Sequence, residues 1–225
     1  MLIVVMSKKL DDLNKKIIDC KKCSRLTNFR EKIAFEKTKR FSNENYWGKP
    51  VIGFGDVHAK IIILGLAPAA HGGNRTGRVF TGDKSADFLF KCLYKAKMSN
   101  KSTSKSLNDG LKLTNIYMTP VLKCVPPNDK PTSDELNNCF SYLIDEFQIL
   151  VNAKILLALG KVAFDSCLKL FGLKRASHKF IHGQCYQINK NLKLMGCYHP
   201  SPRNVNTGRI DEGRMLEVLF EVKKL

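Results

Sequence analysis

Four of the eight cysteines form two pairs that lie far apart in the sequence. Cys20 and Cys23 are separated by two residues, and Cys124 and Cys139 follow about a hundred residues later. Four thiols that converge on one point are the ligand set of a structural zinc site or of an iron–sulfur cluster, and the spacing alone leaves both alternatives open. The other four cysteines lie in apolar stretches and are expected in the core: Cys92, Cys167, Cys185 and Cys197.

A glycine-rich loop after residues 61–64 carries two side chains that could act on a planar ligand. Five glycines between Gly65 and Gly82 allow its backbone to approach a ligand closely, although the loop has neither the P-loop nor the dinucleotide-binding pattern. Phe80 could stack on a base, and Asp83 could face a developing cation or a water. Each has a structural alternative, because aromatic residues are commonly core and an aspartate before a helix commonly caps it.

A histidine occupies the corresponding position after the last apolar run, at residues 192–198. His199 is followed by Pro200 and Pro202, which stiffen the loop and suit it to hold an imidazole in a crevice. A purely structural histidine is the alternative. The residues that follow offer side chains for phosphate contacts or for insertion into a base stack: Arg203, Asn204, Asn206 and Arg209.

The elements that must position these residues alternate between short apolar runs and helical patterns. The apolar runs are 61–64, 116–122, 155–159 and 192–198, and the helical patterns are 8–23, 86–98, 132–150, 161–171 and 211–223. Strands that alternate with helices predict an α/β fold with a parallel sheet covered on both faces. Ligands of such sheets bind beyond the carboxyl ends of the strands, where both candidate loops begin. We expect one domain over 1–225, with 1–59 as a basic N-terminal arm.

The charge of the chain predicts a polyanionic partner. Lys and Arg number 38 against 20 Asp and Glu, which gives a formal net charge of +18 and favours nucleic acid through counterion release. A basic surface with no specific partner is the alternative. The apolar run Met1 to Met6 is too short for a signal peptide or a membrane-spanning helix, so no membrane role is expected. We expect a cytoplasmic protein with reduced thiols.

The glycine-rich loop is the first of two motifs that resemble a known family. Its residues are Gly65-Leu66-Ala67-Pro68-Ala69-Ala70-His71-Gly72-Gly73-Asn74-Arg75-Thr76-Gly77-Arg78, with Phe80-Thr81-Gly82-Asp83. They resemble the first active-site motif of the family-5 (type B) uracil-DNA glycosylases. His199-Pro200-Ser201-Pro202-Arg203-Asn204 resembles the second motif of the wider superfamily. The four paired cysteines match the ligand spacing of the [4Fe-4S] cluster in families 4 and 5. The resemblance covers nearly the whole chain in the right order.

This resemblance implies a three-layer α/β/α fold with a central four-stranded parallel sheet and a structural [4Fe-4S] cluster, with zinc as the alternative. It implies hydrolysis of the N-glycosidic bond of uracil, and of hypoxanthine and xanthine, in DNA, which leaves an abasic site for base excision repair. The catalytic residues would be Asp83 and His199. The implied base contacts are Gly65, Ala67, His71 and Phe80; the implied DNA contacts are Asn74, Arg75, Ser201, Arg203 and Asn204; the implied ligands are Cys20, Cys23, Cys124 and Cys139.

The sequence departs from the family pattern at two positions, and these limit which residue roles the resemblance implies. Pro120 stands four residues before the third cysteine, where some related enzymes have an asparagine that reads uracil, which suggests a looser pocket. Asp129, preceded by Asn128, stands directly before Lys130, where an asparagine is expected, so no role is assigned there.

Neither motif contains a lysine able to form a Schiff base, which predicts a monofunctional enzyme. We expect a monomer, with a sliding clamp as a conceivable partner. A cluster-bearing nucleic-acid-binding protein without catalysis is the rival interpretation; an electron-transfer protein would explain the cysteines but not the two loops.

Overall fold

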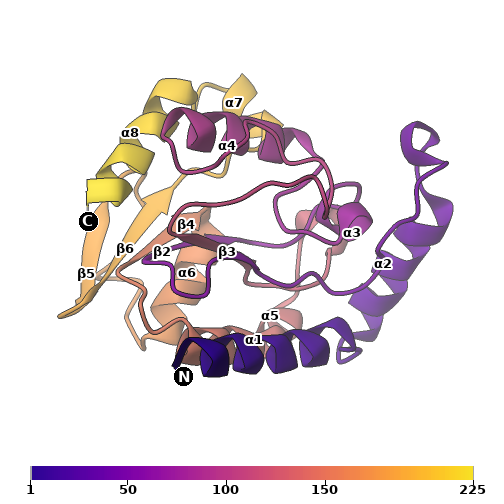
Figure 1. The fold of residues 1–225 in the computed structure, drawn as a ribbon, viewed down its shortest axis with the longest axis horizontal. Helices are drawn as coiled ribbons and strands as arrows, with labels where there is room; N and C mark the ends of the chain where they lie inside the picture. Colours follow the sequence, from indigo (N-terminus) through magenta and orange to yellow (C-terminus); the bar gives the residue numbers. More distant parts are fainter. Residues whose placement is uncertain (1, 225) are drawn as a thin grey trace.

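The computed structural model describes residues 2–224, which form a six-stranded sheet between two layers of helices (Figure 1). Its four central strands, in the order β3-β2-β4-β6, are parallel: β2 (Ile61–Gly65), β3 (Ile116–Pro120), β4 (Ile155–Leu159) and β6 (Leu192–Cys197). The predicted α/β/α fold with four parallel strands is confirmed. Two antiparallel edge strands, β1 (Phe54–Gly55) and β5 (Cys185–Asn189), were not predicted.

Both faces of the sheet are buried because successive side chains of each central strand enter opposite cores. In β2, Ile63 packs with α4 (Lys84–Lys95) and α8 (Glu212–Lys224), whereas Ile62 and Leu64 pack on the other side. That second side is covered by α5 (Ser133–Ile149) and α6 (Lys161–Leu170). The uninterrupted apolar runs of the sequence are therefore strands in contact with helices on both faces.

The N-terminal residues form two helices that flank the sheet domain. Helix α1 (Leu2–Ile18) lies along α5, and its buried Leu13 and Ile17 join a third apolar cluster with Leu26 of α2 (Ser24–Glu36). The sequence predicted no helix within residues 24–59, so α2 was not predicted. Leu26, Phe29 and Ile33 stand at helical spacing, but only Leu26 and Arg30 of α2 are buried, so its apolar face is narrow. The single-domain assignment with an arm over 1–59 stays a prediction.

Short helical turns close the loops at the carboxyl edge of the sheet: α3 (Gly73–Thr76), η2 (Pro127–Asp129) and α7 (Pro202–Asn206), with η1 (Lys39–Phe41) following α2. Strand β2 lies between β3 and β4, so the connections after β2 and β3 leave in opposite directions. Such a reversal opens a crevice at the carboxyl ends of the strands. Among residues 2–224, no helix has the length and apolar character that crossing a membrane would require.

Candidate active site

A cleft of about 370 Å³ opens at the carboxyl edge of β2, β4 and β6, where the topology predicts it. Its walls come from the loop after β2, the start of α6, and the loop after β6. Among the predicted site residues, Ala67, His199 and Ser201 line the cleft directly. The rest of the lining is Leu66, Ala69, Ser85, Asp129, Leu159, Gly160, Lys161, Val162, Ala163 and Pro202.

The two loops singled out in the sequence meet through Phe80 and His199. The centroids of their rings are 6.4 Å apart, and the ring planes are inclined by 30°. The Phe80 ring also lies against Gly65, where an added Cβ would come within 2.5 Å of its Cζ atom. Phe80 has a φ of 48°, which is strained for a bulky residue, so the loop holds this ring in place at a conformational cost.

Asp83 caps the helix that follows the first loop. Its Oδ1 accepts a hydrogen bond from the backbone N–H of Ala86 at 2.9 Å, as an N-cap aspartate does. Burial raises the pKa of this carboxyl, and the backbone N–H groups of Ala86 and Ser85 oppose the rise. An added Cβ on Gly72 would stand 2.2 Å from Oδ2, so only glycine leaves room for this carboxylate. The structural alternative for Asp83 is therefore real, but one oxygen is not used by the cap.

His199 is held by contacts that leave its ring at the cleft. The Asn204 side-chain amide donates to the His199 carbonyl at 2.8 Å, and Gly160 faces its Cβ, with 3.5 Å to an added Cβ. Burial lowers the pKa of the imidazole, and the negative charge of Asp129 partly opposes this. The neutral imidazole is thus the form present near neutral pH, and it can donate one N–H to an acceptor in the cleft.

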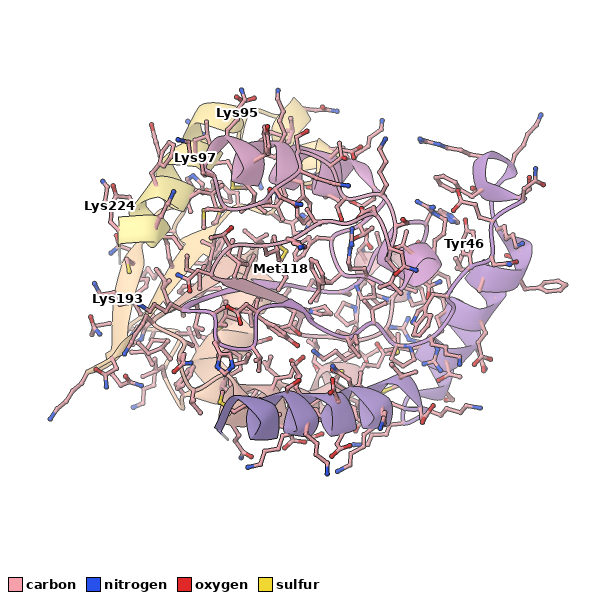
Figure 2. All side chains as sticks on the ribbon, viewed as in Figure 1. Tyr46, Lys95, Lys97, Met118, Lys193 and Lys224 are labelled. Carbon is pink, nitrogen blue, oxygen red and sulfur yellow. The ribbon has the colours of Figure 1, made fainter. Side chains whose placement is uncertain are left out.

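His71 lies beside the N-terminal arm rather than on the cleft wall. Its Nδ1 is 3.0 Å from the hydroxyl of Tyr46, and the two rings meet edge to face; Figure 2 labels Tyr46 beside α3. Burial and the nearby Arg75 guanidinium lower the pKa of His71. The predicted base contact of His71 stays a prediction, and Tyr46 is a neighbour that the sequence did not indicate.

The predicted DNA contacts divide into two groups. Asn74 and Arg75 are buried: Asn74 Nδ2 donates to the Arg30 carbonyl at 3.2 Å, and Arg75 donates to the carbonyls of His71 and Gly82. Asn74 Oδ1 is buried and has no hydrogen-bond partner among the described residues. These contacts hold the loop in shape, and the DNA contacts of Asn74 and Arg75 stay predictions.

The second-motif group remains accessible. Arg203 is exposed, and Ser201 and Asn204 are half-buried. Ser201 Oγ also caps α7 by accepting from the Asn204 N–H. DNA contacts by these three residues stay predictions.

Two charged residues at the cleft were not assigned a role from the sequence. Lys161 is the first residue of α6, separated from the end of β4 only by Gly160, and its Nζ is 2.7 Å from the Asp165 carboxylate in the next turn of α6. Asp129 lies in the η2 turn with a φ of 57° and acts electrostatically on His199. Both reach the cleft only because β4 pairs with β6 and because the segment after β3 folds back, which are long-range features.

The four paired cysteines line one cavity between the arm and α5, as the sequence predicted. Three sulfurs accept hydrogen bonds: Cys124 from the Arg30 guanidinium at 3.1 Å, Cys139 from the Lys123 N–H at 3.3 Å, and Cys23 from the Asn138 amide at 3.7 Å. Burial raises the pKa of Cys139 to about 12, so this thiol needs a metal to become a thiolate. Among the described residues, however, no three His, Cys, Asp or Glu side chains are arranged so that they could hold a single metal ion. The shared cavity and the donors to the sulfurs suit cysteine ligands, and the cluster itself stays a prediction.

That cavity is tied to the sheet by a buried ion pair. Lys123, directly before Cys124, donates from Nζ to Glu146 Oε2 and to Thr119 Oγ1, each at 2.7 Å, and all three side chains are buried. Glu146 lies on α5, the helix that also carries Cys139. The cysteine cavity, the end of β3 and α5 are therefore fixed relative to one another. Of the other cysteines, Cys92, Cys167 and Cys197 are buried as predicted, whereas Cys185 is only half-buried.

Comparison with known sequences agrees with this geometry. The family described as "Uracil DNA glycosylase superfamily" matches residues 52–223. A type-5 uracil-DNA glycosylase of Pyrobaculum aerophilum is 42% identical over 209 residues, which cover 93% of this chain and 90% of the relative. One of Thermus thermophilus is 42% identical over 206 residues, covering 92% and 93%. The chain belongs to the type-5 branch of the uracil-DNA glycosylase superfamily.

The superfamily match contains both loops of the cleft. Phe80, Asp83 and His199 lie inside it, as do Cys124 and Cys139, whereas Cys20 and Cys23 precede its first residue. A type-4 uracil-DNA glycosylase of Archaeoglobus fulgidus is more distant, at 29% identity over 196 residues, covering 85% of this chain and 81% of the relative. The family resemblance inferred from the motifs is confirmed.

Proposed function

We propose that this protein hydrolyses the N-glycosidic bond of uracil in DNA and so begins base excision repair. The observation behind this proposal is that the loops after β2 and β6 of a uracil-DNA glycosylase fold meet through the rings of Phe80 and His199, and that His199 lines the cleft. Asp83 belongs to the same loop as Phe80 and caps α4. A base inside a duplex is out of reach of this cleft, so the nucleotide must be flipped out of the stack. The net charge of +18 supports DNA as the partner.

His199 is assigned to the leaving base. As the bond between C1′ and the base nitrogen breaks, its electron pair moves into the base and negative charge develops on a base oxygen. A neutral imidazole can donate its N–H in a hydrogen bond to this oxygen, and it does not have to lose a proton before it can do so. The Phe80 ring is buried next to His199 and is assigned to stack on the base that enters beside this pair of rings.

Asp83 is assigned to the sugar. Loss of the base leaves oxocarbenium character at C1′, and a carboxylate nearby stabilises this positive charge. Water then adds to C1′: its hydroxyl stays on the sugar and its proton balances the charge of the departed base. Oδ1 is committed to the Ala86 N–H, so Oδ2, beside Gly72, is the oxygen assigned to this role.

We infer a substrate range that includes hypoxanthine and xanthine. Pro120, the last residue of β3, pairs in the sheet with Gly65, and it has no carboxamide with which to select uracil. A pocket without such a polar reader discriminates weakly between bases that share a carbonyl. Excess enzyme should release uracil, hypoxanthine and xanthine from matched oligonucleotides, detected as strand breaks after alkali. An intact uracil strand with tight DNA binding would instead identify a binding protein without catalysis.

We infer that the enzyme is monofunctional. Lys161 lies on the cleft wall, but its ammonium is paired with the Asp165 carboxylate, so it does not offer a free amine. Borohydride added during turnover should trap no covalent protein–DNA adduct. An adduct that disappears in Lys161→Gln would show that this lysine forms a Schiff base and would overturn the inference.

We propose that Cys20, Cys23, Cys124 and Cys139 hold a [4Fe-4S] cluster, which would staple the arm to α5 rather than take part in hydrolysis. The shared cavity and the three donors to its sulfurs support a cluster, and type-5 membership favours it over zinc. The native protein should be coloured and contain about four irons per chain. A colourless protein with one zinc would contradict the cluster.

The monomeric state, the sliding clamp and the cytoplasmic location stay predictions.

A further inference from the structure

A basic segment with an exposed aromatic side chain follows α2 and projects from the body of the protein. We call residues 35–42 the hook. It begins at Phe35, the most exposed large apolar side chain of those described at 89%, and ends after η1 at Ser42. Figure 1 shows α2 running outward past α3, at the end of the molecule opposite both termini.

The hook carries a concentration of positive charge. Residues 37–42 contain Lys37, Lys39 and Arg40 and no acidic residue, and the one carboxylate of the hook, Glu36, pairs with Lys32 at 3.7 Å. Lys39 and Arg40 are exposed and form no ion pair among the described residues. The Arg40 guanidinium lies over the Phe41 ring, 5.0 Å from its centre. Exposed cations in the same segment as an exposed aromatic side chain are the chemistry that recognises nucleic acid, through phosphates and base or sugar faces.

The hook is attached to the active-site loop. The Arg75 guanidinium lies 3.9 Å from the centre of the Phe41 ring, and it also forms an ion pair with Glu44 just after the hook. The same guanidinium donates to the carbonyls of His71 and Gly82, on either side of α3. One buried arginine thus fixes the hook to the loop that holds Phe80 and Asp83.

The backbone adds to this attachment. Lys37 ends α2 with a φ of 53°, which turns the chain back, and its Nζ donates to the Ser42 carbonyl at 3.2 Å. The N–H groups of Trp47 and Gly48 then donate to the carbonyls of Arg75 and Asn74. The end of the hook at Phe41 and the residues that follow it are therefore held against α3, in the loop that also carries Phe80 and Asp83.

We propose that the hook is a second DNA-binding surface, which grips the strand flanking the nucleotide in the cleft. Lys39 and Arg40 contact phosphates, and Phe35 packs on a flanking sugar or base. This inference rests on the proposed function for its partner, but it concerns affinity for the flanking DNA and not the excision step.

The test measures binding of the full protein to undamaged duplex DNA of about 20 base pairs, roughly two helical turns, across a salt series. The double variant Lys39→Gln/Arg40→Gln should bind about 3- to 10-fold more weakly at low salt, and its slope of log Kd against log salt should fall by about 1 to 2. Phe35→Ala should lose at least about 5-fold in affinity. Both variants should keep the melting temperature of the wild type, because these side chains are exposed.

A matched control removes two positive charges at the other end of the molecule. Figure 2 shows Lys97 and Lys193 at the end opposite the hook, so Lys97→Gln/Lys193→Gln should leave affinity and slope near those of the wild type. Unchanged affinity and slope in the hook double variant would overturn the proposal, as would an equal loss in the control. Because undamaged DNA is not cut, these results are independent of the excision assay, whose failure alone would reject the proposed function.

Discussion

Asp83 can be tested as a cap and as a functional carboxylate separately, because one oxygen serves each role. Serine also caps helices well, so Asp83→Ser keeps an acceptor for the Ala86 N–H but removes the negative charge, whereas Asp83→Ala removes both. Loss of the cap costs about 1 kcal/mol, which lowers Tm by about 2–4 °C for a chain of this size. Loss of one electrostatic stabiliser lowers the rate by about 10² to 10³.

The two variants should therefore differ in stability and agree in activity. We expect Asp83→Ala to melt lower than Asp83→Ser, while both lose about 10² to 10³ in single-turnover excision of uracil and keep nearly the wild-type affinity for DNA. Asp211 provides the control, since its Oδ1 accepts from the Arg214 N–H at 2.9 Å at the start of α8 and its side chain is exposed. Asp211→Ala should lower Tm without slowing excision. A normal rate in Asp83→Ser would refute the role of the charge and leave Asp83 as a cap alone.

Three further predictions concern the same constellation. His199→Ala should lose about 10² to 10³ in single-turnover rate, and normal turnover would show that the imidazole does not stabilise the leaving base. Because burial raises the pKa of Asp83, the wild-type rate should fall with acidification at a higher pH than an exposed aspartate would give; a rate–pH profile of Asp83→Ser that keeps this acid limb would assign it elsewhere. Gly72→Ala should slow excision about as much as Asp83→Ala, because its Cβ would displace Oδ2, and an unaffected rate would mean that the position of Oδ2 is unimportant.

The central strands could be predicted from the sequence because they are buried on both faces and read as unbroken apolar runs. β1 has only two residues and β5 is half-exposed with no clear alternation, so neither had a detectable pattern. Helix α2 was not predicted because its apolar face is narrow (Leu26, Phe29 and Ile33) and lies in an otherwise polar, basic segment; the buried Arg30, which donates to the Gly48 carbonyl, also holds it.

The candidate site residues that belong to short sequence motifs could be identified from the sequence. Phe80, Asp83 and His199 stand in recognisable loops, and the parallel topology required those loops to meet. Lys161, Asp129 and Tyr46 could not be found in this way, because their positions depend on contacts between segments distant in sequence. The burial of Asn74 and Arg75 could not be predicted either, because polar residues in a glycine-rich loop look accessible in the sequence, whereas here they contact Arg30 and Glu44 of the N-terminal arm.

A crystal structure of Asp83→Ala bound to DNA containing one uracil would show directly whether the loops after β2 and β6 enclose a flipped nucleotide. We predict a uracil nucleotide rotated out of the helix, with its ring against Phe80, a base oxygen within hydrogen-bonding distance of the His199 ring, and C1′ facing the place left by the carboxylate. A uracil that stays stacked in the duplex, or that occupies a site away from these residues, would contradict the account.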